Sequence, residues 1–218
     1  MKKQKILNHY IEKQDEIESR IEDFKALRKA GDERLFQELS FVIFSSQSSA
    51  ENSWNACKEL RAKGLLEKDR EKISEVLSRN EIQYEERKAE YIVKNRKFLS
   101  QPTFENPSTE LKLKSWIKPG NLEKTRKWIA ENIKGLSWKG SSHFLRNIGY
   151  GDNFAILSQH TVSVLFDLDV LKIAEPPKNE TEYLEAEKKV QKFSEEIEIE
   201  MEALDLTMWS YKTSNVFK

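Results

Sequence analysis

Residues 133–147 carry the side chains whose types and spacing best suit a chemical task, and that task is the binding of phosphate. The stretch reads Ile-Lys-Gly-Leu-Ser-Trp-Lys-Gly-Ser-Ser-His-Phe-Leu-Arg-Asn, in which one helix is expected to end at a glycine turn and a second to begin within a few residues. The first amides of a helix have no acceptor inside it, and together with the positive end of the helix dipole they attract an anion. The candidate phosphate-binding residues are Lys134, Gly135, Ser137, Gly140, His143 and Arg146.

Polar side chains also recur along the second helix of this stretch. Lys139, His143, Arg146 and Tyr150 follow one another at intervals of 4, 3 and 4 residues, which predicts one polar stripe. The opposite side, with Phe144, is apolar and is expected to face a core. The alternative is an ordinary helical hairpin with a solvated basic stripe, because such connections are common. Spacing alone leaves both interpretations open.

The segments that position this hairpin are predicted to be helical as well. Apolar residues recur with helical periodicity almost throughout and no segment alternates like a strand, so the predicted fold class is all-α. Residues 34–45 are the most apolar segment and are expected to be central. Helices are expected at about residues 12–30, 34–45, 49–62, 68–77, 85–99 and 122–133. Three more are expected: one that follows the glycine turn and ends at about residue 148, one that begins near residue 158, and one in the acidic segment after Pro176-Pro177. A loop is expected at 101–108.

Charge is balanced over the chain but not along it. The sequence holds 37 basic and 37 acidic side chains, a balance that by itself argues mildly against a nucleic-acid binder. Residues 111–150 contain nine Lys or Arg against two Glu, whereas residues 179–202 contain nine Glu against three Lys. One segment is therefore suited to phosphates and the other is repelled by them.

Metal sites, disulfides and membrane spans are not expected. The single cysteine, Cys57, excludes a disulfide within the chain and a cysteine-ligated zinc or iron–sulfur cluster, and three histidines make a multi-histidine site unlikely. We predict no metal and no organic cofactor. The basic start of the chain lacks the apolar run of a signal peptide, and no apolar run approaches the ~20 residues of a membrane span. We expect an intracellular protein of the cytoplasm or nucleoid, without membrane contact.

Two neighbouring strings carry a family resemblance. Residues 138–149, Trp-Lys-Gly-Ser-Ser-His-Phe-Leu-Arg-Asn-Ile-Gly, and residues 154–160, Phe-Ala-Ile-Leu-Ser-Gln-His, closely resemble the archaeal and thermophilic-bacterial class of 8-oxoguanine DNA glycosylase/AP lyases, in the helix-hairpin-helix superfamily. The resemblance covers roughly residues 30–218. It implies one glycosylase-type unit over residues 1–218, built as two helical lobes with a cleft between them and a hairpin motif at about 122–148.

The resemblance assigns chemistry to Lys139, which matches the family's catalytic lysine. It implies that a neutral amine attacks C1′ of the damaged nucleotide, displaces the base, forms a Schiff base and permits β-elimination of the 3′ phosphate. The positive end of a helix disfavours the ammonium form of a lysine there. The alternative is a solvated or phosphate-contacting lysine.

Ser158 and Ser137 depart from the family pattern. The family has a catalytic aspartate at the position of Ser158, whose hydroxyl supplies an N-cap but no negative charge. A unit charge pair at ~4 Å is worth roughly 4 kcal/mol at an effective dielectric of ~20, so its loss would cost on the order of 10³ in rate. Asp152 and Asp167 are candidate replacements. Ser137 stands where the family usually has glycine, which tolerates positive φ and close phosphate approach better than serine.

Four further residues match family positions near the base pocket. Gln47 aligns with a loop that reads a base edge or fills the gap left by a flipped nucleotide, and its alternative is a plain helix-linking loop. Lys218 matches a terminal lysine associated with recognition of the oxidised guanine, and its alternative is a frayed chain end. His160 is expected to support the active site. Trp209 is a candidate stacking residue, as are Trp54, Trp138 and Tyr211, although aromatics are more often core residues.

Three functions follow from these patterns. The first is a bifunctional glycosylase/AP lyase, expected to act as a monomer on double-stranded DNA that contains a damaged base or an abasic site. The second is a catalytically impaired homologue that binds such DNA, acts only as an AP lyase or takes another modified base, because the aspartate is missing. The third is a non-enzymatic helical protein that docks through the acidic residues 179–202.

Overall fold

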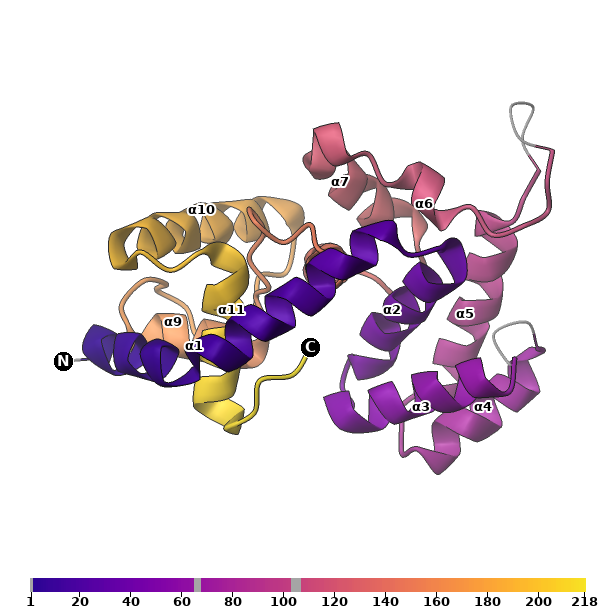
Figure 1. Ribbon diagram of the computed structural model, residues 1–218, viewed down its shortest axis with the longest axis horizontal. Helices are drawn as coiled ribbons and strands as arrows, with labels where there is room; N and C mark the ends of the chain where they lie inside the picture. The colour runs from indigo at the N-terminus through magenta and orange to yellow at the C-terminus, as the bar shows by residue number, and fades with distance from the viewer. Residues whose placement is uncertain (1, 65–67, 103–106) are drawn as a thin grey trace. The chain divides into compact units, whose positions relative to one another are not determined.

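The computed structural model describes residues 2–64, 68–102 and 107–218, and the regular structure of these residues is helical, without strands (Figure 1). The all-α prediction is confirmed. The α-helices are α1 (Lys2–Ala26), α2 (Asp32–Ser45), α3 (Ala50–Ala62), α4 (Arg70–Arg79), α5 (Glu85–Leu99), α6 (Leu113–Trp116), α7 (Leu122–Asn132), α8 (Trp138–Asn147), α9 (Gln159–Asp167), α10 (Glu180–Ile197) and α11 (Met201–Thr213).

Local capping signals explain where several helices begin. Ser49, Asn121, Ser158 and Asn179 each accept a hydrogen bond from a first-turn amide of α3, α7, α9 and α10 respectively. Such side chains satisfy amides that have no acceptor within the helix. Ser49 and Ser158 were the starts expected from the sequence.

The largest differences between the predicted and the observed helices lie at α1 and α6. α1 begins at Lys2 rather than near residue 12, because Ile6, only 2% exposed, extends its buried face toward the N-terminus. The short helix α6 was not predicted. The predicted loop at 101–108 lies partly outside the described residues, since positions 103–106 are not described.

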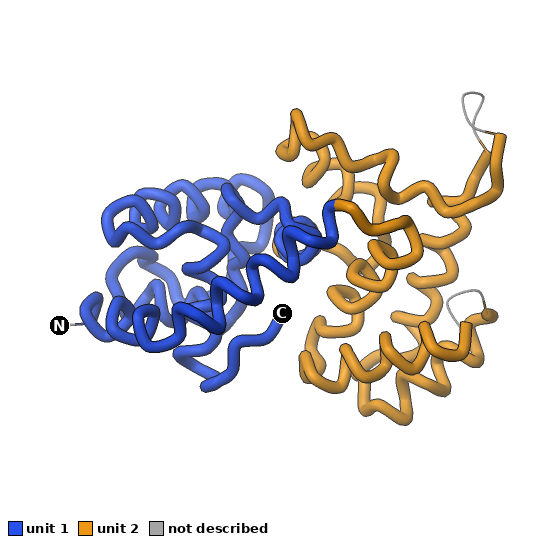
Figure 2. The backbone as a smooth tube through the Cα atoms, in the orientation of Figure 1, with its two compact units in different colours: residues 1–28, 141–218 blue, residues 29–140 orange. Residues whose placement is uncertain are grey.

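The chain divides into two compact units, drawn in different colours in Figure 2. The first comprises Met1–Arg28 and Ser141–Lys218, and in it α11 packs against α1 and α9. Phe24 of α1 and Leu204 of α11 are among its buried apolar side chains. The removal of such side chains from water is the main stabilising contribution to a helical core.

The second unit, Lys29–Gly140, is built around α2. Residues 35–44 of α2 are all buried, and α3, α5 and α6 pack against this helix. A helix that is buried all round is central to its domain, so the prediction for residues 34–45 is confirmed. The buried carboxylate of Glu38 is compensated by Arg34, whose Nη2 lies 2.7 Å from Glu38 Oε1.

The acidic segment 179–202 is not a uniformly solvated surface. Glu187 of α10 is buried and accepts a hydrogen bond of 2.8 Å from the amide of Ala155. Glu202 at the start of α11 is also buried and pairs with Lys25 of α1 at 3.1 Å. Part of this negative charge therefore holds the first unit together. No helix among the described residues combines the length and the apolar character that crossing a membrane requires.

Candidate functional site

The predicted hairpin is present at the predicted place. α7 ends at Asn132, a turn follows over residues 133–137, and α8 begins at Trp138. Lys134, Gly135 and Ser137 are exposed in this turn. The exposed turn before the N-terminus of α8 thus has the form that suits a phosphate.

Gly135 is required by the geometry of the turn. Its φ of +88° lies in the left-handed region, and a Cβ at this position would lie 2.6 Å from Cδ2 of Tyr91. Ser137, in contrast, has no positive φ. Within this turn Gly135 alone takes the left-handed conformation, so the backbone at position 137 does not require glycine. The effect of the serine side chain on close phosphate approach stays a prediction.

Asn95 of α5 holds the turn through two hydrogen bonds to Lys134. It was not predicted as a site residue from the sequence. Its side-chain Nδ2 donates to the carbonyl of Lys134 at 2.9 Å, and its Oδ1 accepts from the amide of Lys134 at 2.8 Å. Asn95 itself is 1% exposed, so its side chain is fixed in the core beneath the exposed turn. An asparagine within a helix of mostly charged and apolar residues was the available sequence signal.

The predicted polar stripe on α8 is not a surface feature. Residues 141–149 are all buried, including His143 and Arg146. Arg146 is 2% exposed, its Nη2 lies 3.3 Å from Oδ2 of Asp205, and its guanidinium lies 4.7 Å from the centre of the Phe24 ring. These contacts tie α8 to α11 and α1, so the structure gives Arg146 a packing role. A direct phosphate contact from His143 or Arg146 is at odds with their burial.

A second arginine of the basic segment is also internal. Arg126 of α7 is fully buried, pairs with Glu123 at 2.7 Å and stacks over the Trp138 ring at 4.8 Å. Trp138 is thereby a packing partner within the hairpin. The exposed basic charge of this region comes from lysines such as Lys124, Lys127 and Lys134.

Lys139 is the second residue of α8 and is half-buried. The residue before it, Trp138, is held by the Arg126 guanidinium. The residue after it, Gly140, lies so close to Leu136 that a Cβ there would be 3.0 Å from Leu136 Cδ2. A lysine in the first turn of a helix lies near its positive end, which disfavours the ammonium form. This placement favours the nucleophilic amine that the sequence predicts, and the catalytic role itself stays a prediction.

Ser158 caps α9 and is linked to a buried carboxylate. Its Oγ lies 2.9 Å from Oγ1 of Thr161, and Thr161 Oγ1 donates to Oδ1 of Asp205 at 3.3 Å. The candidate replacements Asp152 and Asp167 instead pair with Arg28 and Lys212, at 3.8 and 3.7 Å. Asp205 is therefore the carboxylate that two successive hydrogen bonds connect to Ser158.

Three further predicted residues of the first unit, His160, Trp209 and Lys218, make contacts that involve an aromatic ring. The His160 and Trp209 rings meet edge to face with centres 5.0 Å apart, which links α9 to α11. Lys218 Nζ lies 6.0 Å from the centre of the Phe24 ring, so the chain end lies against α1. These contacts agree with a supporting role for His160, and the part of Trp209 and Lys218 in base recognition stays a prediction.

Gln47 lies at the tip of the loop between α2 and α3. It is exposed and has a φ of +58°. Lys88 of α5 donates three hydrogen bonds to this loop, to Phe44 O, Ser46 O and Ser48 Oγ at 2.8, 2.6 and 3.2 Å. Lys88 was not singled out as a site residue, because a lysine in a charged helix gives no sign of burial.

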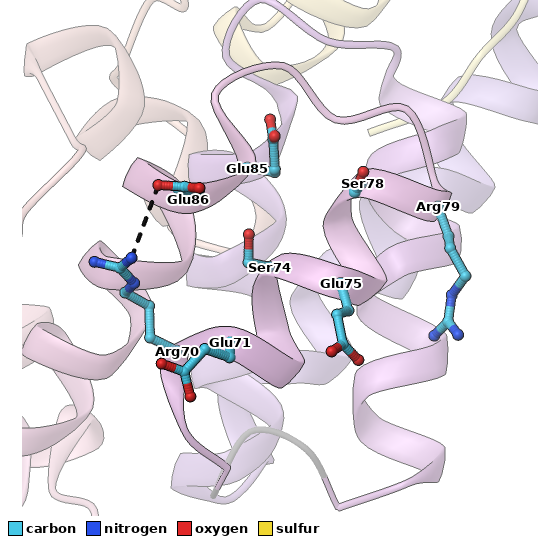
Figure 3. Close-up of a pocket in the computed structure, with 8 residues that line it drawn as sticks. All are labelled: Arg70, Glu71, Ser74, Glu75, Ser78, Arg79, Glu85 and Glu86. Carbon is cyan, nitrogen blue, oxygen red and sulfur yellow. Dashed lines mark ion pairs between the residues drawn. The ribbon is translucent and has the colours of Figure 1, made fainter.

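An open hollow of the second unit lies apart from these residues. It is lined by α4 and the first turn of α5, and Figure 3 shows charges of both signs around it, among them the Arg70–Glu86 pair at 3.7 Å. None of the predicted site residues lines it. Within the described part of the chain, no three His, Cys, Asp or Glu side chains are grouped as metal ligands.

The all-helical fold and the glycine hairpin define a helix-hairpin-helix protein. A protein family described as 8-oxoguanine DNA glycosylase matches residues 17–199. The chain belongs to this family.

Relatives along the whole chain agree with this assignment. A protein of Fusobacterium nucleatum named 8-oxoguanine DNA glycosylase/AP lyase is 35% identical over 228 residues, covering 100% of both chains. The protein of the same name from Methanocaldococcus jannaschii is 31% identical over 94% of this chain and 92% of its own.

Solved structures agree as well. The 8-oxoguanine DNA glycosylase of Thermotoga maritima has a TM-score of 0.85 at 30% identity, covering 99% of this chain and 97% of the other. The Methanocaldococcus jannaschii glycosylase/lyase in complex with a 15mer DNA that contains 8-oxoguanine has a TM-score of 0.82 at 30% identity, covering 94% and 93%.

Proposed function

We propose that this protein excises 8-oxoguanine from double-stranded DNA and then cleaves the strand by β-elimination, with Lys139 as the nucleophile. The observation that carries the proposal is the position of Lys139 in the first turn of α8, directly after the glycine hairpin, in a chain that matches 8-oxoguanine DNA glycosylase/AP lyases over its full length. The related Methanocaldococcus protein binds DNA that contains 8-oxoguanine, which supports the choice of substrate.

The reaction needs a neutral amine at Lys139. Its lone pair forms a bond to C1′ while the N-glycosidic bond breaks. The base leaves with the electron pair of the broken bond and takes up a proton. The attacking nitrogen then loses a proton, and its lone pair opens the sugar ring to an iminium between Lys139 and C1′, while O4′ leaves with the electrons of the ring bond and takes up a proton. Loss of a proton from C2′ expels the 3′ phosphate, and water finally releases the lysine.

The exposed hairpin turn supplies the phosphate contacts in this proposal. Lys134 brings charge, Gly135 lets the backbone approach the phosphate closely, and Ser137 offers its hydroxyl. Asn95 keeps the turn in place through its two bonds to Lys134. We infer that the protein acts as a monomer, as one glycosylase-type unit, and extrudes the damaged nucleotide from the stack.

Position 158 provides no carboxylate to stabilise the positive charge that develops on the sugar during base release. Ser158 supplies a hydroxyl, and its bond to Thr161, which in turn donates to Asp205, orients that hydroxyl without bringing a charge to the sugar. We therefore expect base release to be slower than cleavage at an abasic site that is already formed, since only the first step develops oxocarbenium charge.

Borohydride trapping tests the lysine chemistry. Wild-type protein and an 8-oxoguanine duplex should give a covalent adduct and a cleaved strand, and Lys139→Gln should give neither. Lys134→Gln is the matched control, because it removes an exposed lysine of the adjacent hairpin turn and should weaken DNA binding while adduct formation at saturation persists. Absence of an adduct from wild type with both 8-oxoguanine and abasic DNA would refute the proposal.

The second candidate is a protein that binds lesions and cleaves abasic DNA without removing the base. The hydroxyl at Ser158 favours it, since a hydroxyl cannot replace a carboxylate charge. Ser158→Asp separates the two functions. A gain in base release with unchanged abasic-site cleavage would show that the missing charge limits excision.

A further inference from the structure

The ammonium of Lys88 is buried in the second unit and has an unusual set of partners. Lys88 is 5% exposed, and among the residues that the structure describes no carboxylate pairs with it. Burial without a compensating charge lowers the pKa of Lys88 to about 8. A buried charge has a large desolvation cost, and the hydrogen bonds that Lys88 donates offset part of this cost.

All three acceptors of Lys88 belong to the loop that follows α2. Phe44 O and Ser46 O precede Gln47, and Ser48 Oγ follows it, so the three bonds enclose Gln47 from both sides. An ammonium has three protons to donate, and here each proton has one acceptor.

Gln47 is held in a conformation that a non-glycine residue rarely adopts. Its φ is +58°, and its side chain is exposed at the loop tip. Such a conformation is unfavourable for an L-residue and persists only where surrounding contacts determine it. The bonds from Lys88 to the residues on either side of Gln47 are contacts of this kind, and the Gln47 side chain between them is exposed.

A second connection fixes the other side of the loop. Ser48 Oγ also accepts a hydrogen bond from the amide of Gln83 at 2.9 Å, in the segment that leads into α5. The hydroxyl of Ser48 therefore joins the loop both to the side chain of Lys88 and to the backbone before its helix.

We propose that Lys88 is a positioning residue for DNA recognition, which fixes the loop of residues 46–48 so that the Gln47 amide enters the duplex where a nucleotide has been extruded. The proposal rests on the proposed function, since it assigns the Gln47 loop a task in binding damaged DNA. Preorganisation of the loop removes the cost of ordering it during binding. Lys88 itself does not touch the DNA.

A mutant cycle on binding tests this role. The ligand is a duplex with a tetrahydrofuran abasic analogue, which presents an extruded site without any base to release. Gln47→Ala and Lys88→Met should each weaken binding about tenfold, the size of a lost hydrogen-bonded contact. The double variant should bind no more weakly than either single variant, because Lys88 acts through Gln47. Binding of an undamaged duplex should stay unchanged.

Further variants separate positioning from a general loss of structure. Lys94→Met makes the same replacement at an exposed lysine of α5 and should bind like wild type. Lys88→Arg keeps a cation that donates to the loop and should recover part of the binding. Should Lys88→Met fail to fold, Ser48→Ala removes one acceptor and no charge, and its weaker loss should likewise be non-additive with Gln47→Ala.

Each outcome decides between the two proposals. The inference would be overturned if the effects of Lys88→Met and Gln47→Ala on binding were additive, or if Lys88→Met lost equal affinity for lesion and undamaged duplexes. Either result would show that Lys88 has a purely structural role, and neither would affect the proposed base release by the wild-type protein. Wild-type protein that neither binds the abasic analogue nor forms a borohydride adduct would refute the proposed function, and the inference with it.

Discussion

The replacement of Asp205 by asparagine tests the buried pair that ties α8 to α11. Asparagine keeps the shape of the side chain and an oxygen that accepts from Thr161, but it removes the charge that faces Arg146. Arg146 is 2% exposed and is bounded by the Phe24 ring at 4.7 Å, so water cannot replace the lost partner without local opening.

The magnitude follows from the distance and the burial. Arg146 Nη2 and Asp205 Oδ2 are 3.3 Å apart, and at an effective dielectric of about 20 their attraction is roughly 5 kcal/mol. Removal of one partner from a buried pair generally costs about 3–5 kcal/mol. Because a domain is stable by only about 5–15 kcal/mol, Asp205→Asn should lose a large part of the total.

Urea unfolding followed by circular dichroism measures this loss. The double variant Arg146→Met with Asp205→Leu should regain most of the stability, since it removes both charges of this pair and leaves neither unpaired. Glu196→Gln, which breaks the exposed pair with Lys3, should change the free energy of unfolding by less than about 1 kcal/mol. A loss below about 1 kcal/mol in Asp205→Asn would refute the reasoning, because it would mean that Arg146 does not depend on Asp205.

Three other changes have defined outcomes. Gly135→Ala should lower the free energy of unfolding by at least about 1–2 kcal/mol in urea, because φ is +88° and the new Cβ meets Tyr91, whereas Gly120→Ala meets nothing within 4 Å and should change little. Ser158→Asp should keep the N-cap but lower the thermal midpoint, since a second carboxylate comes near Asp205, and an unchanged or higher midpoint would argue against that proximity. The pKa of Lys88 is about 8 in the fold and 10.5 unfolded, so between these pH values the unfolded chain binds more protons. The stability of wild type relative to Lys88→Met should therefore rise with pH in this window, by up to about 1.4 kcal/mol per unit, and a difference that stays constant or falls would contradict the buried ammonium.

Sequence alone was sufficient for the fold class and for most helix positions. Helical periodicity and capping residues such as Ser49 and Ser158 depend only on residues nearby in the sequence, so they can be recognised without knowledge of the fold. The hairpin before Trp138 was predictable for the same reason, because a glycine turn between two helices is a local pattern.

Tertiary structure decided which polar side chains are available to a ligand. Arg146 belongs to a basic stretch, but its charge is compensated by Asp205 of another helix, and Lys88 is turned toward a loop that follows α2. Burial and pairing depend on residues that are distant along the chain, and no local pattern contains them. Helix positions could thus be read from neighbours in sequence, whereas the assignment of Asn95, Lys88 and Arg146 to structural tasks depends on neighbours in space.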